Sequence, residues 1–191
     1  MNRKNLGARL GLYPTPVVVV GTYDKDNKPN LITLAWAGVC CSEPPCLQIS
    51  VRKNRYSWSA ITERGAFSVN VPSKKYVTET DYIGIASGRD ANKFEVTGLT
   101  PIKGELVDAP LVKEFPVSME CLLKHSLEVG SHDLFVGEIV ACWIDEEAPK
   151  EGTKVRAEKI DPLLYMPGGE YFGIGELIAG GYTLGKKLIK K

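Results

Sequence analysis

The chain has 191 residues, of which 43% are hydrophobic and 25% are charged, and its formal net charge is +1. This length suits a single domain spanning 1–191, with a core at about 6–160 and a tail at 161–191. The near-neutral charge argues against a nucleic-acid or anionic-membrane partner. The longest apolar run, Val17 to Val20, is too short for a membrane span, and Met1 to Leu10 is polar and basic. We therefore expect a cytoplasmic protein.

The first part of the chain predicts three strands and a loop of small residues. Val17 to Tyr23 is apolar and rich in β-branched residues, which is typical of a buried strand. The segment 24–29 consists of turn residues, so Asn30 to Ala35 is expected to return as a hairpin partner. A loop of small residues closed by Pro44-Pro45 follows, and Leu47 to Val51 is the next predicted strand.

Two helices separated by a strand are expected next. Asn54 can cap a helix from about Arg55 to Glu63, and Gly65 lies just past its end. Ala66 to Val71 is β-branched and apolar enough to form a strand. The second helix opens at Pro72-Ser73 and extends to about residue 85.

One short helical turn and two longer strands follow. Asp90 is expected to cap the turn that contains Lys93, and Gly98 would stop it. Val117 to Lys124 alternates between apolar and polar residues, as a half-buried strand does. His132 to Ile144 is apolar on both faces, as a central barrel strand would be.

These elements favour a mainly β fold with peripheral helices. Six or more strands joined mostly by short turns indicate a closed antiparallel barrel with helices on its outside. Residues 145–158 are charged and predict an exposed turn or loop. The glycine- and tyrosine-rich tail at 162–185 is expected to wrap over the surface or over a partner subunit. The strands do not alternate regularly with long helices, so a Rossmann sheet is not expected. Gly173-Ile-Gly175 lacks the third glycine, the preceding strand and the downstream acid of a dinucleotide fingerprint.

The five cysteines are expected to be reduced thiols, not a disulfide framework. Cys40, Cys41 and Cys46 lie close together, while Cys121 and Cys142 fall in strand-like segments. The C-C-x4-C spacing matches no zinc or iron–sulfur pattern, so no metal site is expected. Two interpretations stay open: small hydrophobic residues packed near the core, or, for Cys40 and Cys41, contact with a ligand.

The segment from Asn30 to Arg52 has the chemistry to bind a flat ligand with a phosphate tail. Small residues let a flat ring lie close to backbone N–H and C=O groups. Arg52, Lys53 and Arg55 come at the start of a predicted helix, where a phosphate is bound favourably. A flat polar ring with a phosphate tail describes flavin mononucleotide, FMN.

Five motifs follow one another along the chain: Leu12-Tyr-Pro-Thr-Pro-Val-Val-Val-Val-Gly21, Thr33-Leu-Ala-Trp-Ala-Gly38 with Ser42-Glu-Pro-Pro45, Ser50-Val-Arg52, Gly65-Ala-Phe-Ser-Val-Asn70, and Gly130-Ser-His-Asp-Leu-Phe-Val-Gly-Glu138. In this order they resemble the flavin reductase-like family of FMN-binding split barrels, especially its flavoredoxin and ferric-reductase branch. The resemblance covers nearly the whole chain. It implies a Greek-key antiparallel split β-barrel with flanking helices, and a homodimer with one FMN per subunit near the interface.

The resemblance also implies roles for single residues. Those expected to line the flavin ring are Thr33, Ala35, Trp36, Cys40, Cys41 and Ser42. Those expected to hold the ribityl phosphate are Ser50, Arg52, Lys53, Tyr56 and Ser57. Lys93 would lie near the cofactor. His132, in the pattern Gly130-x-His132-x4-Gly137, would lie beside the incoming nicotinamide and is the expected catalytic residue.

Structural alternatives stay open for several of these residues. Arg52 and Lys53 would otherwise be an exposed strand end, and Trp36 a core aromatic. Lys93 would be a cation on a helix surface, and His132 a satisfied polar group in a strand. The residue types alone do not decide between these roles.

The expected function is an FMN-dependent oxidoreductase. Hydride would move from NADH or NADPH to the flavin, and electrons would pass to free flavin, a ferric complex or a partner protein. The alternative is a flavoredoxin-type electron carrier that is reduced by a protein partner without direct use of a nicotinamide. A third interpretation is a flavin-binding or sensing module without turnover.

Overall fold

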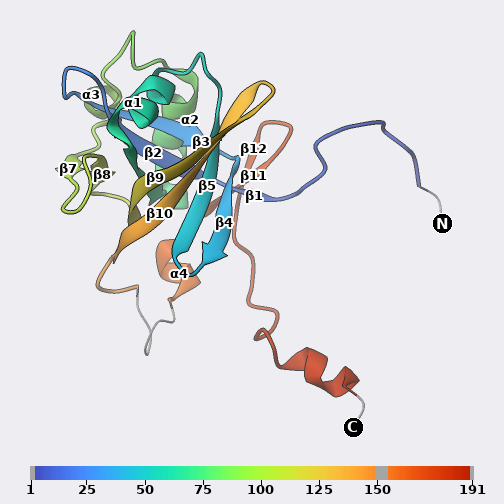
Figure 1. The fold of residues 1–191 in the computed structure, drawn as a ribbon. Coiled ribbons are helices and arrows are strands. Elements are labelled where there is room, and N and C mark those ends of the chain that lie inside the picture. Colours follow the sequence, from blue (N-terminus) through green and yellow to red (C-terminus); the bar gives the residue numbers. More distant parts are fainter. Residues whose placement is uncertain (1–2, 149–154, 190–191) are drawn as a thin grey trace.

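The structure, a computed structural model, describes residues 3–148 and 155–189, and a seven-stranded antiparallel sheet is its largest element (Figure 1). Its strand order is β3-β2-β6-β9-β10-β5-β4. The bounds of these strands are β2 Val18–Tyr23, β3 Pro29–Leu34, β4 Ala37–Ser42, β5 Pro45–Val51, β6 Ala66–Val71, β9 Val117–Val129 and β10 His132–Ile144. The predicted strands of the barrel are therefore present.

The two outer strands of this sheet, β3 and β4, are joined by only Ala35 and Trp36. The sheet must therefore curl until its edges approach each other. The backbone N–H of Ser50 donates to the carbonyl of Trp36 at 2.9 Å, which holds this connection against β5. Within the described residues no ladder joins β3 to β4. The mainly β fold with peripheral helices is confirmed, but the closed ring of strands is wrong, because the sheet stays open between β3 and β4.

The interior of the curled sheet is filled mostly by side chains that the two-residue period of the strands turns inward, and Ile61 joins them from helix α1, Tyr56–Arg64. Its buried members are Val18, Val20, Ile32, Leu47, Ile49, Val51, Ile61, Phe67, Val69, Cys121 and Phe135. Gly137 lets β10 approach this core closely: an added Cβ would lie 2.5 Å from Cζ of Phe67. The second glycine of the histidine motif therefore serves packing. The first, Gly130, has φ +62° in the turn between β9 and β10, a conformation that favours glycine.

Helices cover the outside of the sheet (Figure 1). Those on the body of the protein are α1 Tyr56–Arg64, η1 Lys74–Tyr76, α2 Val77–Ile85, α3 Lys93–Thr97 and α4 Ala157–Ile160, while η2 Leu184–Leu188 lies in the C-terminal segment that extends away from the sheet. Gly65 ends α1 with φ +63°, as predicted. Two predicted caps are wrong. Arg55, not Asn54, is the N-cap of α1 and makes no side-chain cap hydrogen bond, while Asn92, not Asp90, caps α3 because it directly precedes the first helical residue.

The segment that the sequence predicts as a loop of small residues is strand β4. It pairs antiparallel with β5, from Ala37 opposite Ile49 to Ser42 opposite Pro45. Small residues and two nearby prolines have low strand propensity, so the sequence gives no sign of this strand. Its backbone hydrogen bonds to β5 stabilise it instead. The prediction of a loop here is therefore corrected to one arm of a hairpin.

The tail returns to the body of the protein as a hairpin and then leaves it. Strands β11 Leu163–Met166 and β12 Glu170–Gly173 form a three-stranded sheet with β1 Thr15–Pro16. A separate ribbon pairs β7 Pro101–Lys103 with β8 Pro110–Val112. Residues 3–14 and 174–189, here called the terminal arms, extend away from the sheet (Figure 1).

Part of the predicted charged loop at 145–158 lies outside the described residues. Among the residues that are described, no helix is both long and apolar enough to cross a membrane.

Candidate functional site

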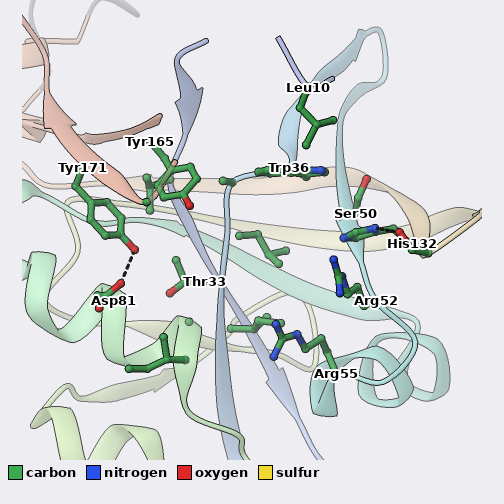
Figure 2. A pocket seen from close by; sticks show the side chains of 18 residues that line it. Leu10, Thr33, Trp36, Ser50, Arg52, Arg55, Asp81, His132, Tyr165 and Tyr171 are labelled. Atoms are coloured by element: carbon green, nitrogen blue, oxygen red, sulfur yellow. Dashed lines mark hydrogen bonds between the residues drawn. The ribbon is translucent and has the colours of Figure 1, made fainter. Parts of the chain in front are cut away.

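A cavity of about 730 Å³ opens where β3 and β4 separate (Figure 2). Its walls come from β3 and the 35–36 connection, from the chain after β5, from the start of β10, and from α2. The β11–β12 hairpin and Leu10 of the N-terminal arm also line it. The opening in the barrel is therefore the place where segments distant in sequence meet.

One end of the cavity is cationic. Arg52 and Arg55 line it, both are exposed, and neither forms an ion pair with another described residue. Arg55 is also the N-cap of α1, whose first-turn N–H groups have no capping side chain. Two guanidinium groups beside the positive end of a helix dipole form a site suited to an anion. We call these residues, together with Ser131 and His132, the cationic end.

His132 opens β10 beside the two arginines, as Figure 2 shows. Partial burial, and then the charges of Arg52 and Arg55, lower the pKa of this imidazole. Its Nδ1 lies 2.8 Å from Oγ of Ser131. The arrangement favours a neutral ring in the absence of a bound anion.

Asp133, the next residue, fastens β10 to the start of α1. Its Oδ2 accepts a hydrogen bond of 2.8 Å from Nε1 of Trp58, and its Oδ1 lies 3.9 Å from Nζ of Lys53. The carboxylate is buried. Asp133 therefore helps to position His132 relative to Arg52 and Arg55.

The opposite end of the cavity is aromatic. Tyr165 and Tyr171 come from the β11–β12 hairpin, and their ring centroids lie 5.6 Å apart with an interplanar angle of 61°. The hydroxyl of Tyr171 donates to Oδ1 of Asp81 on α2 at 3.0 Å (Figure 2). Burial and this hydrogen bond raise the pKa of Tyr171 to about 12. We call Tyr165, Tyr171 and Asp81 the aromatic end.

Between the two ends, β3 and α2 form a shared wall. The hydroxyl of Thr33 donates to the carbonyl of Thr80 at 2.6 Å. Behind this wall Lys93 is buried, and its Nζ donates to the carbonyls of Leu31 at 2.7 Å and Ile83 at 2.8 Å. Burial, and then the charge of Arg55, lower the pKa of Lys93 to about 8.

The structure brings part of the predicted set together around this cavity. The predicted residues that line it are Thr33, Ala35, Trp36, Ser50, Arg52 and His132. The predicted residues that do not line it are Cys40, Cys41, Ser42, Lys53, Tyr56, Ser57 and Lys93. For this second group, contact with a cofactor stays a prediction.

Each residue of the second group has another environment. The β4 residues 40–42 are exposed. Lys53 pairs with Glu128 at 2.7 Å. Tyr56 donates to Oδ2 of Asp24 at 2.9 Å, and Ser57 is buried and accepts from Nδ2 of Asn30 at 2.8 Å. Tyr56 and Ser57 therefore attach α1 to the first hairpin.

Sequence reasoning missed several residues that line the cavity. Arg55 was named among the cations but not as a site residue, and its position at the helix start was the available signal. Tyr165 and Tyr171 belong to the tyrosine-rich tail, whose return to the cavity no local pattern indicates. Asp81 and Ser131 carry no distinctive spacing.

Among the described residues, no group of three or more histidine, cysteine, aspartate or glutamate side chains is placed to hold a metal ion.

Comparison with known proteins identifies the family. A family model described as a flavin reductase like domain matches residues 10–175. The chain belongs to the flavin reductase-like family. The resemblance inferred from its motifs, and the split-barrel fold that this resemblance implied, are thereby confirmed.

Two solved structures of family members cover almost the entire chain. Flavoredoxin of Desulfovibrio vulgaris (Miyazaki F) is 45% identical, with a TM-score of 0.92, covering 96% of this chain and 100% of that one. Flavoredoxin from Methanosarcina acetivorans is 34% identical, with a TM-score of 0.92, covering 99% and 100%. A flavin reductase (NADH) of Kitasatospora aureofaciens is 28% identical over 141 residues, which are 73% of this chain and 71% of that protein.

Proposed function

We propose that this protein is an FMN-dependent oxidoreductase that accepts hydride from NADH or NADPH and passes electrons to free flavin, a ferric complex or a partner protein. The observation that carries the proposal is the cavity at the opening of the barrel. At one end lie Arg52 and Arg55, which form no ion pair with another described residue, beside the start of α1, whose N-cap makes no side-chain hydrogen bond. Membership of the flavin reductase-like family supports a flavin as the group that this cavity takes.

The residues present fit FMN. The cavity of about 730 Å³ is of the size that cofactor sites have, about 300–1,000 Å³. Arg52, Arg55 and the first-turn N–H groups of α1 would hold the phosphate. Thr33, Ala35 and Trp36 would lie along the ring. When bound, the flavin supplies the hydride and electron chemistry, and the protein supplies position and electrostatics.

His132 would act at the cationic end, as a neutral imidazole beside Arg52 and Arg55. From there we propose that it orients the carboxamide of the incoming nicotinamide and balances charge on the reduced flavin. Ser131 holds Nδ1, so Nε2 remains available for this contact. The same location suits a contact with the FMN phosphate, and the two roles predict different defects when His132 is removed.

An anaerobic absorbance experiment tests the proposal. The purified chain is reconstituted with FMN, freed of excess flavin, and mixed with NADH or NADPH. A bound-flavin spectrum that bleaches quickly is the expected result. A protein that holds no stoichiometric flavin would contradict the proposal.

A flavoredoxin-type electron carrier is the second candidate function. The observation that favours it is the 45% identity to the D. vulgaris flavoredoxin over 96% of the chain. In this case a protein partner would reduce the FMN, and the nicotinamide would not be used. Bound flavin that stays oxidised after addition of NADH and NADPH would support this candidate over the first.

We also propose that the chain forms a homodimer. The terminal arms carry large apolar side chains that the body of the protein leaves exposed, namely Leu6, Leu10, Leu12, Tyr13, Leu177, Ile178, Tyr182, Leu184, Leu188 and Ile189. Large apolar side chains exposed in this number along the two arms would be buried against a second copy of the chain. Light scattering of the full chain should give the dimer mass, and a chain that ends at Gly173 should shift toward the monomer. A full chain that stays monomeric would contradict the proposal.

A further inference from the structure

Three of the five cysteines meet in the β4–β5 hairpin. Cys41 on β4 is the direct cross-strand partner of Cys46 on β5. The register of the two strands shifts between Val39 and Cys41, so Cys40 is the extra residue of a β-bulge and has no partner of its own on β5. Tertiary pairing, not sequence spacing, therefore selects one pair out of the three thiols.

The geometry of this pair suits a disulfide. Residues directly opposite in antiparallel strands have Cα atoms about 4.5–5.5 Å apart. Disulfides form when the Cα atoms are about 4.4–6.8 Å apart. Both thiols are free in this structure. The direct cross-strand opposition of Cys41 and Cys46 therefore gives the Cα spacing that a disulfide requires.

The two thiols differ in accessibility. Cys41 is exposed, and its Sγ lies 3.4 Å from the carbonyl oxygen of Glu43, to which the thiol donates. Cys46 is buried, and burial, followed by the proximity of Cys41 and then Cys40, raises the pKa of its thiol. Of these two thiols, Cys41 is therefore the one that an external oxidant can reach, and Cys46 is the one that can then react with the oxidised Cys41.

We propose that Cys41 and Cys46 form a redox-active dithiol that a peroxide converts into a cross-strand disulfide. The sulfur of Cys41 attacks one oxygen of the peroxide, the O–O bond breaks, and the first water leaves, which gives a sulfenic acid at Cys41. The sulfur of Cys46 then loses its proton and attacks Sγ of Cys41. The S–S bond forms, the S–O bond breaks, and the second water leaves. For hydrogen peroxide the two thiols together lose two electrons, and the peroxide is reduced to two waters.

The disulfide would join the two strands that follow the cavity-lining Trp36 in the chain. Trp36 immediately precedes β4. The cross-link would lie at the far end of β4 from Trp36. There it would join β4 to β5 next to the turn between Ser42 and Pro45. Formation of this disulfide does not depend on the nicotinamide chemistry proposed for the cavity, because it requires only the β4–β5 hairpin and a peroxide.

The test is a thiol count after oxidation of the full chain as purified. The protein is fully reduced, freed of reductant, and treated with a small excess of hydrogen peroxide. Thiols are then counted with a chromogenic disulfide reagent under denaturing conditions. The count should fall from five to three, dithiothreitol should restore it, and non-reducing peptide mapping should find Cys41 linked to Cys46.

Matched variants separate this pair from the other thiols. Cys41→Ser changes an exposed residue and should prevent the intramolecular cross-link. Cys40→Ser and Cys142→Ser also change exposed residues and should leave it intact. A count that stays at five, or a cross-link that maps to Cys40, to Cys142 or between two chains, would overturn the assignment.

Discussion

The two ends of the cavity are built in different ways. The cationic end comes largely from one continuous stretch, in which Arg52 and Arg55 follow β5 and lead into α1. The aromatic end joins α2 to a hairpin that arrives from the end of the chain, held by the bond between Tyr171 and Asp81. The arginines of the cationic end form no ion pair with another described residue, so their charge is available to a ligand, whereas at the aromatic end the hydroxyl of Tyr171 donates a hydrogen bond to Asp81. We therefore expect the affinity for FMN to depend mainly on the cationic end, and the shape of the cavity to depend mainly on the aromatic end.

The largest effect is expected from Arg52→Ala. Each charge-assisted hydrogen bond to a phosphate is worth about 1.5–3 kcal/mol, so FMN should bind about tenfold to hundredfold more weakly. Quenching of FMN fluorescence at low salt measures this affinity. Lys103→Ala, an exposed cation on β7 outside the cavity, is the matched control and should change the affinity less than about twofold. A similarly small change for Arg52→Ala would remove it from the phosphate site.

The next effect is expected from His132→Ala. If this histidine orients the nicotinamide, the variant should retain FMN and be reduced about tenfold more slowly, which corresponds to about 1.4 kcal/mol in the barrier. Stopped-flow absorbance measures the reduction rate, and the retained flavin is quantified on the same sample. Loss of FMN with an unchanged reduction rate after reconstitution would instead place His132 at the phosphate.

Lys93 tests the wall that the two ends share. Its pKa is about 8 in the folded protein against an ordinary value of 10.5, so between these values the unfolded chain binds more protons than the folded one. The stability of the wild type relative to Lys93→Met should therefore rise, by about 1–3 kcal/mol, as the pH rises through this window. Urea unfolding of both proteins at about pH 7.5 and about pH 10 measures the difference. If the stability difference between the wild type and Lys93→Met does not change with pH, burial does not lower the pKa of Lys93 and the prediction is wrong.

The smallest effect is expected from Tyr171→Phe. The variant keeps the ring but loses the hydrogen bond to Asp81, which is worth about 0.5–1.5 kcal/mol at most. FMN affinity should change less than about threefold, since about 0.6 kcal/mol is the corresponding free energy. Thermal unfolding measures the loss of stability, and the fluorescence titration measures the change in FMN affinity. A loss of affinity as large as that of Arg52→Ala would remove the contrast between the two ends.

The sequence predicted the location of a residue best where both its side-chain chemistry and the local strand or helix pattern indicated the same site. Arg52 directly follows the predicted strand that ends at Val51 and precedes the predicted helix by only a few residues, so both its charge and its place could be inferred. Cys40, Cys41 and Ser42 were assigned to a loop because a run of small residues looks like one, although pairing with β5 makes the segment a strand. Lys93 was expected to lie near the cofactor, and its Nζ donates hydrogen bonds to two backbone carbonyls, those of Leu31 and Ile83.

By itself the sequence determined the family, the strand-rich architecture and the cationic end of the cavity. These depend on side-chain alternation, turn residues and charge, all of which are local properties of the chain. Only the tertiary structure decided that the barrel opens between β3 and β4, that Tyr165 and Tyr171 return to the cavity, and that Cys41 rather than Cys40 opposes Cys46. The reason is physical: each of these depends on which segments distant in sequence hydrogen-bond to one another, and strand register is set by long-range pairing.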